Sequence, residues 1–292
     1  MFFWKKPKPK KPPLKKYPMP KYDPKPFVPP EPPKIDQRKE KDSSEKGTTS
    51  FDPEKDFMRT FSELVGYRTW DAWKDFIVMS ACAISNSLDK FHFEEREARY
   101  LRTIQRYSPK EQQVFPRLFS DVVLALEENP EQDFLGDIYM KLSLGDSGLK
   151  QMFTPYSVCS CMSELTVDDA AEQVKKRGYI KLSDPCCGAG ATLIAGVHAI
   201  RKQLEQENLN FQNHILVVGQ DIDETVTMMC YIQLSLLGVA AYFKVGDALT
   251  EPISVKDTLE NYWFTPMYFS KVWSMRRAFH QFDAVFGEER GE

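Results

Sequence analysis

The chain has 292 residues, of which 42% are apolar and 28% are charged, a composition typical of soluble globular proteins. No apolar run approaches the roughly 18 residues of a membrane span, and the first four residues lead into lysines and prolines without the apolar stretch of a secretory signal. These features argue against a membrane or secreted protein, so we expect a cytoplasmic location.

Residues 1–50 are predicted to form a disordered Pro/Lys-rich arm. Twelve of the twenty prolines lie between Pro7 and Pro33, where they remove hydrogen-bond donors and disfavour a packed core. Residues 1–40 carry 12 Lys and Arg against 4 Asp and Glu, whereas the rest of the chain carries 27 against 38. Such a basic arm suits contact with DNA phosphates or with a protein partner. A solubilising linker is the alternative interpretation.

A helical domain is predicted for residues 51–150. It begins with Asp52-Pro53, an N-cap residue followed by proline at the first helical position. The spacing of apolar residues predicts helices at Phe57 to Val65, Trp70 to Ile84, Leu101 to Tyr107 and Val114 to Leu126. We interpret their aromatic side chains as core residues and not as a base-stacking surface.

The third predicted domain covers residues 151–292, in which strand-like runs alternate with helices from about residue 178. Strands are predicted at 179–182, 215–218, 239–245 and 282–286, and helices at 191–206 and 226–237. This alternation is typical of an α/β fold with a mostly parallel, doubly wound, Rossmann-like sheet.

The segment Asp184-Pro185-Cys186-Cys187-Gly188-Ala189-Gly190 carries the strongest functional signal. It ends the first predicted strand and leads into a helix. Glycines at this position let the backbone approach a ligand, and the helix N-terminus offers free N–H groups. A nucleotide-like ligand is therefore expected, although any tight strand-to-helix turn can contain such glycines.

Acidic residues end the next two predicted strands. Asp221, in Gly219-Gln220-Asp221-Ile222-Asp223, is in position to accept hydrogen bonds from ribose hydroxyls. Asp247, which follows Gly246, can accept from an adenine amino group while Ile222 packs against the ring. Upstream, Phe153-Thr154-Pro155 precedes an amphipathic segment.

In this order, the four motifs resemble those of the adenine-specific (N6) DNA methyltransferases, which include the modification subunits of type I restriction systems. The resemblance covers residues 60–250 and implies a methyltransferase fold, S-adenosylmethionine as cofactor and DNA as partner. It implies that Phe153, Thr154 and Pro155 lie beside the methionine part of the cofactor. It further implies that Asp221 accepts from the ribose of the cofactor and that Ile222 and Asp247 hold its adenine. The loop under the cofactor would be formed by Asp184, Cys186, Gly188 and Gly190.

The sequence departs from this family after the fourth predicted strand. There the family has Asn/Asp-Pro-Pro-Phe/Tyr, which accepts hydrogen bonds from the target amino group and stacks on the flipped base. Here residues 287–290 read Gly-Glu-Glu-Arg. We therefore assign no catalytic residue and expect impaired or absent methyl transfer by the isolated chain. Transfer could require a protein partner or a separate catalytic or specificity portion. Asn261 and its aromatic neighbours lack the paired prolines of the motif, so we expect them to form a lid or a partner-binding surface more than a substitute for it.

Two other functions stay open. The chain could be a non-catalytic relative that binds DNA or protein, or a methyltransferase that acts on RNA or protein glutamine, since fold alone does not fix the substrate. A metal site is not expected, because the spacings Cys159-x-Cys161 and Cys186-Cys187 differ from the usual two-residue zinc knuckle.

Overall fold

The structure is a computed structural model that describes residues 52–142, 144 and 152–286, with side chains described as far as residue 279. The predicted arm at residues 1–50 lies outside the described residues, as do residues 287–292.

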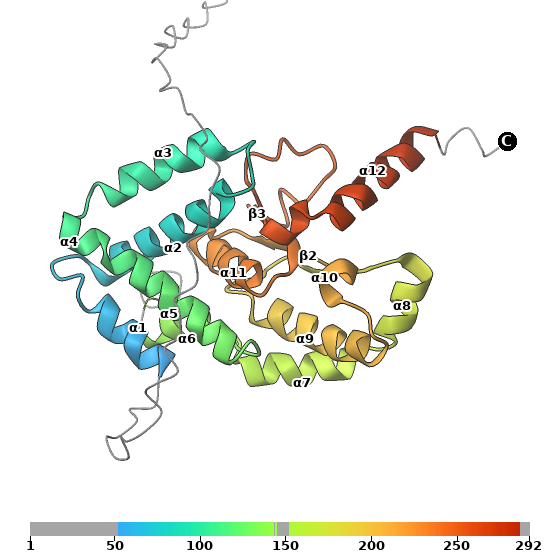
Figure 1. The fold of residues 1–292 in the computed structure, drawn as a ribbon, viewed down its shortest axis with the longest axis horizontal. Coiled ribbons are helices and arrows are strands. Elements are labelled where there is room, and N and C mark those ends of the chain that lie inside the picture. Colours follow the sequence, from blue (N-terminus) through green and yellow to red (C-terminus); the bar gives the residue numbers. More distant parts are fainter. Residues whose placement is uncertain (1–51, 143, 145–151, 287–292) are drawn as a thin grey trace, which may run out of the picture. The chain divides into compact units, whose positions relative to one another are not determined.

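The N-terminal part of the described chain is helical (Figure 1). The Asp52 side chain accepts a hydrogen bond from the Lys55 amide at 3.1 Å and so caps the first helix. Phe57, Trp73 and Phe76 are buried against one another, which confirms the interpretation of these aromatic residues as core. The helices are α1 (Pro53–Phe61), α2 (Thr69–Asn86), α3 (Phe93–Ile104), α4 (Pro109–Gln112), α5 (Val114–Glu128) and α6 (Phe134–Lys141).

The following part alternates helices and strands. Its first elements are α7 (Tyr156–Thr166), α8 (Ala170–Arg177), β1 (Ile180–Asp184), α9 (Ala191–Gln206), α10 (Phe211–His214), β2 (Ile215–Asp221), α11 (Glu224–Leu236) and β3 (Ala240–Val245). Its last elements are β4 (Tyr262–Phe264), the 3₁₀ helix η2 (Pro266–Phe269) and α12 (Lys271–Phe286). The strands predicted near residues 180, 215 and 240 and both helices predicted between them are thus confirmed.

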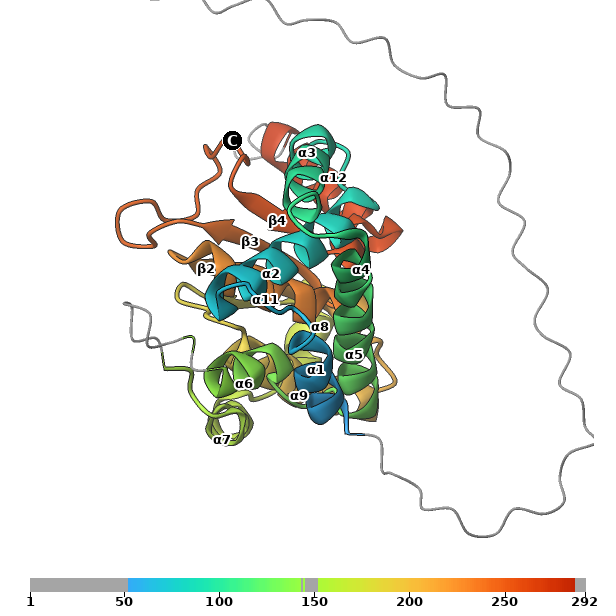
Figure 2. The ribbon, with the colours of Figure 1, turned by 90° about the vertical axis from the view of Figure 1, so that its left-hand side faces the viewer.

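The strands form one sheet in the order β1-β2-β3-β4. β1, β2 and β3 are parallel, and β4 pairs with β3 in the antiparallel direction. α11 packs on β2 and β3, and α2 packs on α11 (Figure 2). The prediction of a mixed α/β fold with a mostly parallel sheet is confirmed.

Two predictions about the sheet are wrong. The segment 282–286 is not a strand, because it continues the helix that begins at Lys271. The fourth described strand is instead Tyr262–Phe264. The doubly wound order is also wrong for the described sheet, whose strands follow one another without reversal. Alternation of strands and helices predicts parallel pairing, but it does not fix the side on which each new strand is added.

A buried polar cluster joins the N-terminal helices to β4. Arg96 donates to Ser85 and Asp89 at 2.6 and 3.0 Å, and also to the Tyr262 carbonyl. Its guanidinium lies 3.8 Å from the ring centroid of Trp263. The described residues, from 52 onward, form one compact unit. The division between residues 150 and 151 stays a proposal, because 145–151 lie outside the described residues.

Candidate functional site

Three parallel strands end at one edge of the sheet. Asp184, the last residue of β1, lies opposite Gly219 of β2, and Asp221, the last residue of β2, lies opposite Val245 of β3. Because the strands run in the same direction, the loops after them emerge side by side. The structure thus brings together the three segments that the sequence singled out.

The loop after β1 is a tight turn built on two glycines. Gly188 has φ +51° and Gly190 has φ +106°, conformations that side-chain-bearing residues rarely adopt. The Cys187 amide donates to the Gln220 carbonyl, and the Gly190 amide donates to the Cys187 carbonyl, both at 2.9 Å. The turn ends at the first residue of α9, whose first-turn amides have no acceptor within the helix.

Asp221 connects all three loops. One carboxylate oxygen accepts from the Gly188 amide at 2.9 Å, and the other accepts from the Asp223 amide at 3.0 Å. Its main-chain carbonyl accepts from the Gly246 amide at 2.9 Å. Each carboxylate oxygen can accept more than one hydrogen bond, so the side chain keeps capacity for hydroxyl donors.

Asp247 and Ile222 follow the ends of neighbouring strands. The Leu249 amide donates to the Asp247 carboxylate at 2.8 Å, and this hydrogen bond holds the pKa of Asp247 below its ordinary value. Asp247 therefore stays an ionised acceptor near neutral pH. Ile222 exposes 69% of its surface, so an apolar side chain is available beside two carboxylates.

Phe153 packs on the glycine turn. A Cβ placed on Gly188 would lie 3.4 Å from the Phe153 ring, which also contacts Tyr139 at a centroid distance of 5.1 Å. Thr154 and Pro155 are exposed at the start of α7. The Cys159 thiol of this helix lies 3.6 Å from the Thr192 hydroxyl of α9. The segment predicted to lie beside the cofactor is thus brought to the turn.

Asp184 and Cys186 form the first half of the same turn. The Asp184 carboxylate accepts from the Cys186 amide at 2.9 Å. Cys186 is exposed, and partial desolvation together with the charge of Asp221 raises the pKa of its thiol. A raised pKa lowers the fraction of thiolate, the nucleophilic form, near neutral pH.

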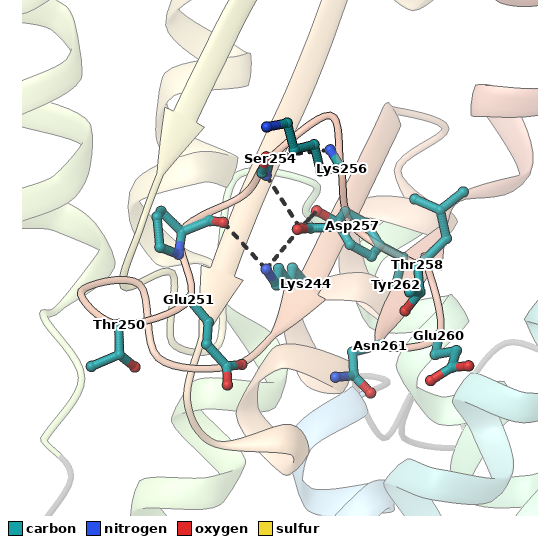
Figure 3. A pocket seen from close by; sticks show the side chains of 12 residues that line it. Lys244, Thr250, Glu251, Ser254, Lys256, Asp257, Thr258, Glu260, Asn261 and Tyr262 are labelled. Atoms are coloured by element: carbon teal, nitrogen blue, oxygen red, sulfur yellow. Dashed lines mark hydrogen bonds and ion pairs between the residues drawn. The ribbon is translucent and has the colours of Figure 1, made fainter.

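Asn261 lies elsewhere, at a cavity of about 470 Å³ formed by the segment between β3 and β4. Figure 3 shows Asp257 at its centre, where the carboxylate accepts from Lys244 at 2.7 Å and from the Tyr262 hydroxyl at 2.6 Å. These two hydrogen bonds, Lys244 first, lower the pKa of Asp257 to about 2. Asn261 directly precedes β4. The aromatic residues Tyr262 and Trp263 are therefore buried strand residues, which corrects the prediction that they belong to a long insertion serving as a lid or partner surface.

Sequence reasoning missed two buried glutamines that support the site. Gln220 donates to the carbonyls of Gly246 and Glu251, at 3.2 and 2.9 Å. Gln233 of α11 donates to the Ala189 carbonyl at 2.9 Å. For Gln233 the sequence offered one signal, a polar residue inside the apolar helix predicted at 226–237.

A glycine turn and acidic residues at the carboxyl ends of adjacent parallel strands are features typical of nucleotide-binding α/β proteins. The sequence profile of one family, described as N-6 DNA Methylase, matches residues 130–287, which is more than half of the chain. The chain therefore belongs to the N-6 DNA methylase family, and the resemblance stated from its motifs is confirmed.

Two solved structures are similar to parts of the chain. One, from Listeria monocytogenes, is described as a class I S-adenosylmethionine-dependent methyltransferase. It is 11% identical with a TM-score of 0.37, over 76% of this chain and 69% of that one. The other, the methyltransferase subunit of a type I restriction-modification system from Streptococcus thermophilus, is 17% identical with a TM-score of 0.32, over 68% of this chain and 44% of that one. No curated protein matches the chain.

Within the described ranges, no helix is long and apolar enough to cross a membrane. The same residues contain no group of three or more His, Cys, Asp or Glu side chains placed to hold a metal ion.

Proposed function

We propose that the chain binds S-adenosylmethionine at the carboxyl ends of β1, β2 and β3, as a protein of the DNA adenine-N6 methyltransferase type. The observation that carries this proposal is the position of Asp221. Its carboxylate accepts from the Gly188 turn, and its carbonyl accepts from Gly246. One residue thereby links the loops of three strands, which supports a nucleoside site at their carboxyl ends.

The residues present fit this cofactor. Gly188 and Gly190 add no side chains in front of the α9 N-terminus, and the Asp221 carboxylate has acceptor capacity for ribose hydroxyls. Ile222 offers an apolar surface to the adenine, and Asp247 an acceptor to its amino group. Phe153, Thr154 and Pro155 would lie beside the methionine part. When bound, the cofactor supplies an electrophilic methyl group.

We propose that this 292-residue polypeptide transfers little or no methyl group to DNA by itself. An adenine amino group needs positioned acceptors and a stacked ring to act as a nucleophile. The sequence contains no Asn-Pro-Pro-aromatic segment, and Asn261 lines a separate cavity after β3. DNA is the proposed partner, and a protein partner that completes the catalytic machinery is compatible with the same arrangement.

Calorimetric titration with S-adenosylmethionine tests the binding proposal. Asp221→Ala should weaken binding by about 1–3 kcal/mol, because ribose hydroxyls lose a charged acceptor. A sharper readout is the preference for S-adenosylhomocysteine over its 2′-deoxyribose analogue, which Asp221→Ala should abolish. Ile222→Ala is the matched control, since it should weaken both ligands equally. A ribose preference that survives in Asp221→Ala removes the assignment, and absence of binding by the parent chain removes the proposal.

Tritiated methyl transfer to unmethylated DNA of mixed sequence tests the second proposal, with a type I-like methylase as positive control. We expect transfer lower by orders of magnitude than in the control, since losing the positioning of a reacting group costs several kcal/mol of barrier lowering. Robust turnover refutes this expectation. Loss of that turnover in Asn261→Ala, with cofactor affinity intact, would then identify Asn261 as the acceptor.

A further inference from the structure

The amide of Gln233 is buried in the middle of α11, with no solvent exposure. Its oxygen accepts from the Leu135 amide at 3.1 Å. Its nitrogen donates to the Asp133 carboxylate at 2.8 Å and to the Ala189 carbonyl at 2.9 Å. Both N–H groups and the oxygen are thus engaged, so the orientation of the side chain is defined.

The Ala189 carbonyl belongs to the peptide unit that joins Ala189 to Gly190, the second glycine of the turn. The N–H of the same peptide unit, that of Gly190, donates to the Cys187 carbonyl at 2.9 Å. Gln233 and Cys187 therefore hold this peptide from opposite sides. Gly190 tolerates both signs of φ, so without such contacts the peptide that joins Ala189 to Gly190 could rotate.

α11 supports the turn at a second point, one helical turn away from Gln233. A Cβ on Gly190 would lie 2.7 Å from the Cys230 thiol, which shows how closely the turn packs on the helix. Residues three apart share one face of a helix, so Cys230 and Gln233 present one surface to Ala189 and Gly190. Asp221 holds the preceding residue, Gly188. Each residue of the turn therefore has its own contact.

The other end of the Gln233 contact is the start of α6. The Asp133 carboxylate caps this helix by accepting from the Gly136 amide at 3.0 Å. The same oxygen, Oδ1, accepts from Gln233. A Cβ at Gly136 would overlap this carboxylate. Gln233 thus connects a helix that precedes the sheet with the glycine turn.

We infer that Gln233 is a positioning residue that fixes the peptide between Ala189 and Gly190, so that the Ala189 carbonyl stays turned toward α11 and not toward the cofactor. The identity of the ligand in this inference rests on the proposed function, whereas the fixed position of the peptide does not depend on it. In Gln233→Met the volume is retained while the Ala189 carbonyl loses its donor. The carbonyl is then free to rotate toward solvent or toward the ligand.

The test compares three variants by calorimetry with S-adenosylhomocysteine and by amide hydrogen exchange. Gln233→Met should weaken binding at least about fivefold, as expected for a carbonyl that loses a buried partner, and should accelerate exchange at Gly190. Asp133→Asn retains Oδ1 and both of its hydrogen bonds, so it should match the parent in both measurements. Gln112→Met should also match the parent, although Gln112 likewise donates to two carbonyls, those of Ile104 and Tyr107.

Unchanged affinity and unchanged Gly190 exchange in Gln233→Met overturn the inference. If the parent chain does not bind the ligand, the proposed function fails, while Gly190 exchange still tests the role of Gln233. If Gln233→Met does not fold, exchange of the Gln233 side-chain amide is measured by NMR in the parent chain. We expect strong protection, and exchange as fast as in an exposed glutamine would refute the inference.

Discussion

Replacing Gly190 by alanine should destabilise the protein more than any other single methyl group added to the glycine turn. The backbone of Gly190 has φ +106°, which costs an L-residue about 1–2 kcal/mol or more. The new methyl carbon would also lie 2.7 Å from the Cys230 thiol and 3.4 Å from the Cys230 Cα. Overpacking of this kind costs about 1–3 kcal/mol. The expected loss in free energy of unfolding is therefore about 2–5 kcal/mol.

Gly188→Ala is the matched control, two residues away in the same turn. Its φ of +51° lies in the left-handed region, and the nearest neighbour of the added Cβ is the Phe153 ring at 3.4 Å. Only the backbone cost of about 1–2 kcal/mol is then expected. Urea unfolding followed by circular dichroism measures both variants, and each kcal/mol should also lower Tm by about 2–4 °C in a unit of this size.

A double variant separates the two causes. Cys230→Ala removes the thiol that the Gly190→Ala methyl would meet. The double variant should therefore lose about 1–2 kcal/mol less free energy of unfolding than the sum of the two single variants. The backbone cost should persist. Equal losses for Gly188→Ala and Gly190→Ala, or full additivity in the double variant, would refute the steric reasoning.

Two further predictions concern charge. Burial raises the pKa of Asp133 to about 6. The folded chain therefore binds a proton that the unfolded chain has released, and stability should fall by about 3 kcal/mol as pH rises from about 4 to 6. Asp133→Asn should remove this part of the slope in urea midpoints, and an unchanged slope would contradict the assignment. Deletion of residues 1–40, which carry 12 basic against 4 acidic residues, should flatten the salt dependence of DNA binding; an identical salt slope would leave the arm as a linker.

Much of the α/β part follows from local sequence signals. The helix predicted at 191–206 has the same bounds in the structure, because a glycine turn fixes its start and an apolar face continues to its end. The acidic residues could also be placed, because the carboxyl ends of parallel strands lie at one edge of the sheet. Their use in holding neighbouring loops, as with Asp221 and Gly188, depends on register and could not be predicted.

The errors occurred where local pattern is ambiguous. Phe282, Ala284 and Phe286 alternate like a strand, yet five residues cannot exclude continuation of the preceding helix. β4 has only three residues, and its pairing of Tyr262 with Lys244 depends on tertiary contact more than on its own propensity. Gln233 was not predicted, because its partner Asp133 is 100 residues away. Neither partner nor geometry is encoded locally.

The contact between Arg96 and the Tyr262 carbonyl has a consequence for synthesis on the ribosome. It joins residues 166 positions apart, so α3 leaves the ribosome long before β4 exists. Closing so long a loop costs more chain entropy than forming a helix, which places this contact late in folding. Until then Arg96 lacks its β4 partner, and surface left uncovered in this way is open to chaperones and proteases. Cellular quality control can therefore detect a nascent chain that fails to add β4.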